Sequence, residues 1–398
     1  MAQTALHEKA RAHSVPLILA GEMQLASSMP ASVGPSRHAG AADAACARRV
    51  RRACARVNLH AVVEDGRMPT PSQQIMRLGF GFAVSQALRV VADLNIPDLL
   101  ASGECSVEEL ADTAGANADA LYRVMRLLAA EGVFRETLPR RFALTDVGAA
   151  LSAGTGSGPR DFVRMINAEP YLAFEQLLHS VRTGEPAFDK VFGKPRFDWL
   201  ATHPDEAHLF QRAMVALSQG ANEAVAEAYD FGVAGRVVDV GGGHGQLLAA
   251  ILARNPHLSG VLFDQPAGIA AAQAGAGGSL PRTEMIAGDF FDAVPPGADV
   301  YIAKKVIHDW DDERAVAILR NCRRAMAPGG KVLLAETIVP AGDEPAQIKM
   351  IDVTMLAVTG GLERTEAQYA ALLAAAGLRL ERLIATPVPI SLLEASGA

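Results

Sequence analysis

The segment Lys304-Lys-Val-Ile-His-Asp-Trp310 places a histidine beside an acid and an aromatic residue, directly after a predicted strand. Side chains at such a position project over the carboxyl edge of an open α/β sheet, where ligands bind. Two glutamates can be placed near it, Glu336 at the end of a later predicted strand and Glu363 in Gly360-Gly-Leu-Glu-Arg-Thr365. A histidine between carboxylates gains basicity and a fixed orientation. The pattern favours His308 as a catalytic base, with a structural histidine as the alternative.

A glycine-rich loop lies in the segment Val237-Val-Asp-Val-Gly-Gly-Gly-His-Gly-Gln246, after a predicted buried strand. Glycines let the backbone turn sharply and approach a bulky ligand, and the helix that follows offers its N-terminus. The loop contains the pattern Asp-x-Gly-x-Gly-x-Gly, formed by Asp239, Gly241, Gly243 and Gly245. This pattern is typical of loops that bind S-adenosylmethionine (SAM), whereas a dinucleotide loop would need glycine in place of Gln246. A tight turn without a ligand is the alternative.

Further candidates for ligand binding follow the next two predicted strands. Asp264 closes the second strand, at a place where an acid accepts hydrogen bonds from ribose hydroxyls in nucleotide-binding folds. Asp289 and Phe290 follow the third strand and offer a carboxylate and a ring face, which suit an adenine amino group and its ring. A surface acid at 264 and a core position for Phe290 are the alternatives.

The elements that must position these residues begin after Arg236, where apolar strands alternate with helices. The predicted strands are Val237–Val240, Gly260–Phe263, Glu284–Ala287, Val300–Ala303 and Lys331–Glu336. Such alternation predicts an α/β fold with a doubly wound, Rossmann-like parallel sheet. We assign residues 231–398 to this domain.

Residues 68–158 predict a separate, mostly helical domain. Apolar residues from Ile75 to Leu94 fall at helical intervals, a capping box at Ser106–Glu109 opens a second helix, and another helix spans Ala118–Ala130. Two short strands then give the order of a winged helix. Seven arginines stand against ten acidic residues between 68 and 150, which disfavours DNA binding and favours a structural or dimerising role.

Two other segments complete the organisation. Residues 159–230 predict a helical segment that links the domains and lines a substrate pocket. Residues 1–67 are rich in Ala, Ser and Arg and lack a sustained apolar period, so we expect them to be disordered. A flexible tail, an organelle transit peptide and translated sequence upstream of a start at Met68 are three explanations for them.

Composition excludes several classes of function. A net charge of −7 over 398 residues argues against binding to nucleic acid. The four cysteines show no metal-ligand spacing and suit a reducing cytoplasm, so no metal site is indicated. No apolar run approaches the roughly 20 residues that span a bilayer, and no membrane partner is expected.

Together these residues resemble the SAM-dependent O-methyltransferase family typified by plant caffeic acid and chalcone methyltransferases and by bacterial polyketide and phenazine tailoring enzymes. The resemblance covers about residues 70–390. It rests on the glycine loop, Phe263-Asp264, Gly288-Asp289, His308-Asp-Trp-Asp-Asp-Glu313, Pro328-Gly-Gly-Lys331, Glu336 and Gly360–Thr365. One departure is Ala357-Val-Thr359, where plant enzymes carry a polar His-Asn-Pro stretch, and it disfavours a plant-like phenolic acid as acceptor.

The resemblance implies a role for each part of the chain. Lys304 lies in the SAM site, His308 is the general base, and Glu336 and Glu363 flank it. The N-terminal domain forms a homodimer and helps to close the partner's substrate pocket. The methyl acceptor is then a small aromatic hydroxyl compound, and a mostly apolar set of residues is expected to line its pocket: Met165, Phe174, Met214, Asp309 and Met355.

Other functions remain compatible with parts of the pattern. An NAD-dependent dehydrogenase could use the same fold, but Gln246 disfavours it. A SAM-binding regulator could use the winged helix on DNA, but the acidic balance of residues 68–150 opposes it. Methyl transfer to nitrogen or carbon, or other SAM chemistry, is also compatible because a fold does not define the acceptor.

Overall fold

The strands and helices after Arg236 form one sheet with helices on both faces. The computed structural model describes residues 69–153, 158–217, 220–275 and 280–398, so the expectations for residues 1–67 lie outside it. Within the described residues this sheet has seven strands, in the order β6-β5-β4-β7-β8-β10-β9. They are β4 Arg236–Val240, β5 Ser259–Asp264, β6 Thr283–Ala287, β7 Val300–Lys304, β8 Lys331–Glu336, β9 Leu378–Ala385 and β10 Ser391–Gly397.

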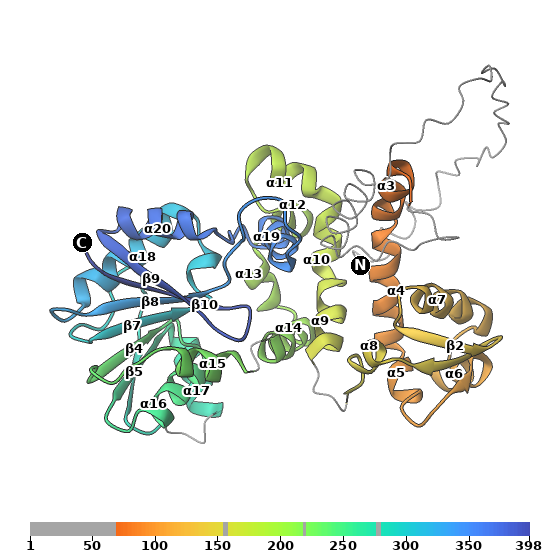
Figure 1. The fold of residues 1–398 in the computed structure, drawn as a ribbon, viewed down its shortest axis with the longest axis horizontal. Helices are drawn as coiled ribbons and strands as arrows, with labels where there is room; N and C mark the ends of the chain where they lie inside the picture. Colours follow the sequence, from red (N-terminus) through yellow and green to blue (C-terminus); the bar gives the residue numbers. More distant parts are fainter. Residues whose placement is uncertain (1–68, 154–157, 218–219, 276–279) are drawn as a thin grey trace, which may run out of the picture. The chain divides into compact units, whose positions relative to one another are not determined.

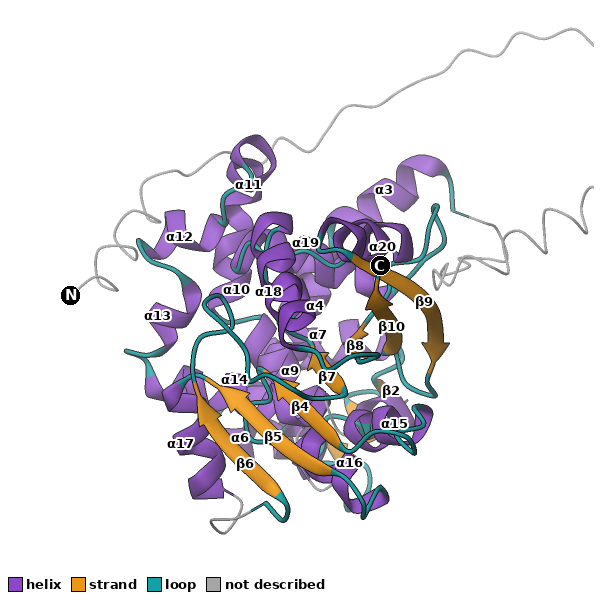
Figure 2. Ribbon diagram, turned by 90° about the vertical axis from the view of Figure 1, so that its left-hand side faces the viewer, coloured by secondary structure: helices purple, strands orange, loops and turns teal. Residues whose placement is uncertain are grey.

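The first five of these strands are parallel, as predicted, and Figure 2 shows them side by side. The expected parallel sheet is confirmed for these five strands, but the edge beyond β8 differs, because β10 pairs antiparallel with both β8 and β9. The connection from β9 to β10 is only a few residues long, which suits an antiparallel hairpin and is too short for a helical crossover. The fold is therefore an α/β domain with a mixed sheet.

Side-chain alternation along the strands explains why both faces are covered. Val238 and Val240 point into a core with α18 (Asp312–Ala325) and α20 (Glu366–Ala375). Val237 points into a second core with α15 (Ala221–Ala228), α16 (Gln246–Arg254) and α17 (Pro266–Gly275), on the other face (Figure 1). Burial on both faces makes these strands nearly continuous apolar runs, which is why the sequence pattern identified them.

The N-terminal helices and strands follow the predicted winged-helix order. They are α3 Pro71–Gly79, α4 Gly81–Asp93, α5 Ile96–Leu99, β1 Cys105–Ser106, α6 Val107–Ala114, α7 Ala118–Ala130, β2 Phe134–Leu138, β3 Arg141–Leu144 and α8 Asp146–Ala149. The capping box between Ser106 and Glu109 is present at the start of α6. One long helix was expected from Ile75 to Leu94, but the chain breaks at Phe80 into α3 and α4.

The segment Pro71–Asp93, which comprises α3 and α4, is the one described segment long and apolar enough to cross a membrane by length and composition. The expectation that no run approaches this length is therefore wrong. Much of the apolar surface is exposed, including Ile75, Met76, Leu78 and Phe80. Composition alone is weak support for a membrane span, because the core helix of a soluble protein and a signal sequence pass the same test.

The segment between the two domains is helical, as predicted. Its elements are α9 Gly158–Ile166, α10 Glu169–Ala173, the 3₁₀ helix η2 Phe174–Gln176, α11 Leu177–Thr183, α12 Ala187–Phe192, α13 Arg196–Leu200, α14 Pro204–Leu217 and α15. α10 and α12 pack against α19 (Gln347–Val358) through Ala173, Phe188 and Ala357, which are fully buried. This packing places the helical segment against the C-terminal domain.

Candidate active site

The glycine loop joins β4 to α16 and is held by backbone hydrogen bonds. The Gly241 N–H donates to the Phe263 carbonyl at 2.8 Å, and the Gly243 N–H donates to the Asp264 carboxylate at 2.8 Å. Gly243 and Gly245 have φ of 54° and 73°, the left-handed region that glycine adopts without strain. The loop is therefore tied to the end of β5, and its last glycine caps α16.

Close packing, as well as backbone conformation, requires glycine in this loop. A Cβ on Gly242 would lie 2.5 Å from the Leu262 side chain and 2.6 Å from the Asp239 carboxylate. A Cβ on Gly241 would lie 2.9 Å from Val306 and 3.8 Å from the Phe290 ring. The backbone at 241–242 thus lies directly against neighbouring side chains, which leave no space for a side chain on either glycine.

A buried carboxylate lies beneath the loop. Asp239 is 1% exposed, and its Oδ2 has no hydrogen-bond partner among the described residues. Burial raises the pKa of Asp239 to about 7, with Lys304 opposing the shift and Asp264 adding to it. The Lys304 ammonium donates to Asn222 Oδ1 at 2.7 Å, and burial lowers the pKa of Lys304. An unpaired buried carboxylate suits a ligand that brings hydrogen-bond donors and positive charge, which SAM does.

The other predicted cofactor residues lie at the same edge. Asp264 accepts backbone N–H groups from Gly243 and from Gln265, the latter at 2.7 Å. Asp289 is exposed and accepts the Phe291 N–H at 2.8 Å. The Phe290 ring lies edge-on to Trp310, with centroids 5.9 Å apart. These strand ends surround the loop, although their contacts with a cofactor stay a prediction.

His308 lies on a short 3₁₀ helix, η3 (Ile307–Asp309), directly after β7. Its Nδ1 lies 2.7 Å from Glu363 Oε1, so Nδ1–H donates to that carboxylate. Its Nε2 faces Asp309 Oδ1 at 3.6 Å. Glu336 accepts the Ile307 N–H at 3.0 Å and is fully buried. The structure therefore brings His308, Glu336 and Glu363 together, as predicted.

The charge of this cluster sets the basicity of His308. Burial lowers the pKa of His308, but Glu336, the hydrogen bond to Glu363 and Asp309 together outweigh burial and raise it above 6.5. Burial raises the pKa of Glu363, but the bond to His308 and the nearby Lys305 ammonium reverse that effect and lower it. The hydrogen bond from His308 to Glu363 is thus charge-assisted, because its acceptor is an ionised carboxylate.

Arg364 holds the histidine turn to the loop that carries Glu363. It is fully buried and donates to the backbone carbonyls of Ile307 at 3.1 Å and Trp310 at 2.8 Å. It also contacts the Asp312 carboxylate at 2.7 Å. Each donor of this guanidinium finds an acceptor across the turn, so Arg364 stabilises the geometry that places His308 beside Glu363.

The residues predicted to line the acceptor pocket lie in different surroundings. Asp309 is adjacent to His308, and the Met355 methyl group lies close to Gly361, whose backbone also approaches the His308 carbonyl. Phe174 packs against the apolar cluster that includes the end of α19. Met165 is buried and lies 3.3 Å from Arg196, which is paired with Glu169. Met214 lies on α14 and is half-buried. Their contacts with an acceptor stay a prediction.

Ligand atoms of His308, Glu336 and Glu363 lie within 4.8 Å of one another, a spacing that a metal ion could bridge. However, His308 Nδ1 is already hydrogen-bonded to Glu363, and the Lys305 ammonium lies 3.4 Å from the same carboxylate. A lysine cation therefore already lies beside these acids. We interpret the group as an ionic network.

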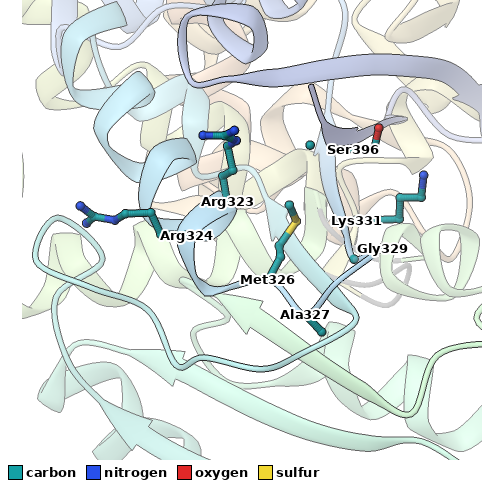
Figure 3. Close-up of a pocket in the computed structure, with 9 residues that line it drawn as sticks. Arg323, Arg324, Met326, Ala327, Gly329, Lys331 and Ser396 are labelled. Atoms are coloured by element: carbon teal, nitrogen blue, oxygen red, sulfur yellow. The ribbon is translucent and has the colours of Figure 1, made fainter.

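A separate cavity of about 360 Å³ lies at the opposite edge of the sheet, where β8 begins and β10 ends. Arg323, Arg324, Lys331 and Ser396 line it (Figure 3). The Arg324 side chain points away from Lys331 and Ser396, and Lys331 lies 3.8 Å from Glu394. Because its charges do not converge, we assign no ligand to this cavity.

Sequence reasoning missed three residues of the site. Arg364 directly follows Glu363 in the segment Gly360–Thr365, so its position beside a predicted site residue could have indicated it. Lys305 stands beside Lys304, but nothing in the sequence indicated that consecutive lysines would reach different carboxylates. Asn222 lies on α15, far from every motif, and only the fold brings it to Lys304.

The glycine loop and the acids at successive strand ends are typical of Rossmann-like domains that bind a nucleotide-containing cofactor. The profile of the O-methyltransferase domain matches residues 174–379, and that of the O-methyltransferase dimerisation domain matches residues 76–154. The chain belongs to this O-methyltransferase family and is a SAM-dependent O-methyltransferase.

Individual relatives include O-methyltransferases and one enzyme named for methyl transfer to nitrogen. A phenazine O-methyltransferase of Lysobacter antibioticus is 43% identical over 329 residues, which is 81% of this chain and 96% of that protein. An 8-amino-8-demethylriboflavin N,N-dimethyltransferase of Streptomyces davaonensis is 35% identical and covers 77% of this chain and 90% of its own length. The O-methyltransferase of neocarzinostatin biosynthesis, solved with SAM and 2-hydroxy-5-methyl naphthoic acid, is 35% identical with a TM-score of 0.68, covering 79% of this chain and 96% of that chain.

Proposed function

We propose that this enzyme methylates a hydroxyl group of a small aromatic secondary metabolite, with His308 as the general base. The observation that carries the proposal is the 2.7 Å hydrogen bond from His308 Nδ1 to Glu363, in a cluster that also holds Glu336. A phenol with a pKa of about 10 is a weak nucleophile at neutral pH, so a base beside it would accelerate transfer about 10²–10⁴-fold.

The proposed mechanism assigns a separate task to each residue of the cluster. SAM, when bound, supplies an electrophilic methyl group on a sulfonium ion. Because Nδ1–H donates to Glu363, the lone pair of His308 is on Nε2, which faces away from Glu363. Nε2 accepts the proton of the acceptor hydroxyl, and Glu363 stabilises the imidazolium that forms. Glu336 fixes the turn by accepting the Ile307 N–H.

The residues proposed to hold SAM surround the glycine loop. Asp239 offers its unpartnered oxygen, Asp264 is positioned for ribose hydroxyls, and Phe290 and Asp289 suit the adenine. Lys304 carries positive charge beside Asp239, which favours the ionised carboxylate there. A side chain at Gly241 or Gly242 would displace Val306 or Asp239, so these glycines keep the loop in contact with residues proposed to surround SAM.

The acceptor and the assembly are inferred from the relatives and from exposed surface. The named relatives act on, or were solved with, flat aromatic compounds, and Phe174 and Met355 offer apolar side chains of a suitable kind. The exposed apolar side chains of α3 and α4 fall mainly within the dimerisation domain, which supports a homodimer that covers them. The cysteine pattern supports a cytoplasmic location.

The test is to incubate the purified enzyme and methyl-labelled SAM with phenols, quinones, phenazines and flavonoids, and with aryl amines for comparison. We expect label in an aryl methyl ether, and that incorporation falls sharply in His308→Gln. Label on amines alone would replace hydroxyl transfer by nitrogen transfer, the reaction named for the riboflavin relative. Full activity in His308→Gln would remove the base assignment.

A further inference from the structure

Two consecutive lysines at the end of β7 reach opposite sides of the site. The Lys304 ammonium contacts Asn222 near the glycine loop. The Lys305 ammonium lies 3.4 Å from Glu363 Oε1 and 4.0 Å from Glu336 Oε2. Lys305 is thus the cation of the His308 cluster, although no motif pointed to it.

The backbone of Lys305 adopts a conformation that side chains rarely take. Its φ is 54°, and its N–H donates to the Ala335 carbonyl of β8 at 3.1 Å. A lysine in the left-handed region is strained, and such strain persists where the surroundings over-determine it, often at functional sites. The lysine side chain is 29% exposed, so it is partly withdrawn from water toward two buried carboxylates.

The charges that face His308 show what this lysine does. Glu336 on β8, Glu363 on the loop after α19, and Asp309 on η3 all favour the protonated imidazole. Lys305 opposes them. Around Glu363 itself lie three further groups: Asp352 on α19, which accepts the Glu363 N–H at 2.9 Å, Arg364, and Tyr369 on α20.

Without its cation, the cluster would hold one imidazole among three carboxyl groups. Protonation of His308 would then neutralise the excess negative charge, and a protonated imidazole has no lone pair to accept a proton. We propose that Lys305 is a positioning residue that keeps His308 neutral and ready to accept the proton of the acceptor hydroxyl. This inference rests on the proposed function of His308 as base.

The test compares Lys305→Met, which removes the charge and keeps the chain length, with Lys305→Arg, which keeps the charge. The His308 titration is followed directly by NMR of enzyme labelled at histidine Cε1, with His308→Gln identifying the resonance. The pH dependence of kcat/KM is measured on the same proteins. Lys331→Met, at the opposite edge of the sheet, is the matched control.

We expect Lys305→Met to raise the pH at which His308 titrates by about one pH unit. The acid limb of the pH profile of kcat/KM, where activity falls as His308 becomes protonated, should move to higher pH by the same amount. Activity at acidic pH should therefore fall about tenfold. In Lys305→Arg and Lys331→Met, the His308 titration and the acid limb of kcat/KM should stay near their wild-type pH. SAM affinity should not change. If Lys305→Met fails to fold, Lys305→Gln tests the same charge.

The two measurements separate this inference from the proposed function. An unchanged His308 titration in the neutral variants overturns the role of Lys305, whatever the rates are. A titration that moves while the acid limb of kcat/KM stays in place supports the role of Lys305 but overturns His308 as the base. Equal shifts in Lys305→Arg would overturn the charge argument, because that variant keeps the cation.

Discussion

The two halves of the site lie on the same edge of the sheet but are built from different parts of the chain. The cofactor half is made mainly by backbone, with glycines at 241–245 packed against Val306 and Asp264. The half around His308 is made by side chains, with buried carboxylates and a lysine around one imidazole. The backbone at Gly241 and Gly242 leaves no space for added atoms, whereas a side-chain network tolerates changes of shape and is sensitive to changes of charge.

This contrast predicts which property each half loses when it is mutated. Added volume should weaken SAM binding in the cofactor half, with little effect on the pH dependence of the reaction. Altered charge should change the rate and its pH dependence in the half around His308, with little effect on SAM binding. The predictions below test this separation, from the largest expected effect to the smallest.

Removal of the proposed base should have the largest effect. His308→Gln keeps a polar side chain but loses the proton acceptor, so we expect kcat to fall about 10²–10⁴-fold. SAM affinity, measured by calorimetry, should stay within about twofold, because the polar contacts of this side chain are with Glu363 and Asp309. A loss of SAM affinity as large as the loss of kcat would show that the two halves are not separate.

Added volume in the glycine loop should come next. Gly242→Ala places a Cβ 2.5 Å from Leu262 and 2.6 Å from the Asp239 carboxylate, and such overpacking costs about 1–3 kcal/mol. We expect SAM affinity to fall about tenfold or more. Gly243→Ala is the matched control for space, since its Cβ would meet nothing within 4 Å although its φ is 54°. Equal losses in the two variants would show that conformation, and not packing, requires the glycines.

The sequence predicted these two halves to different degrees. Strands buried on both faces are apolar runs, and their glycine and acid ends follow directly in the chain, so β4 to β8 and the loop were found. β9 and β10 were missed because β9 alternates buried and exposed positions irregularly, and nothing local marks an antiparallel edge. His308, Glu336 and Glu363 stand in recognisable motifs, whereas Asn222 reaches the site only through tertiary packing.

Removal of the carboxylate that accepts the His308 hydrogen bond should have an intermediate effect on kcat. The direction in which the acid limb of kcat/KM moves tests the charge argument. Glu363→Gln removes the negative charge that lies beside His308 Nδ1. The pKa of His308 therefore falls, and the acid limb of kcat/KM moves to lower pH. In the wild type that limb should lie above pH 6.5, because the pKa of His308 is raised. We expect a maximal kcat about tenfold lower, since the imidazolium loses a charged acceptor.

The direction of that shift is opposite to the one expected for Lys305→Met, although both variants neutralise a single charge. Glu366→Gln, an exposed glutamate at the start of α20, controls for loss of a carboxylate in the same region. A shift of the acid limb to higher pH in Glu363→Gln would contradict the charge argument for the whole cluster.

The smallest effect should come from Asp264. Its side chain supports the cofactor half by accepting hydrogen bonds from the backbone. Its two oxygens accept the Gly243 and Gln265 N–H groups, so Asp264→Ala should loosen the loop and remove a hydroxyl acceptor. We expect SAM affinity to fall about threefold to tenfold, with the acid limb unchanged. Asp264→Asn keeps a neutral acceptor for Gly243, so it should retain more affinity if the loop contact dominates. Unchanged calorimetric SAM binding in Asp264→Ala would remove Asp264 from the cofactor site, because neither the loop contact nor the ribose contact would then contribute to binding.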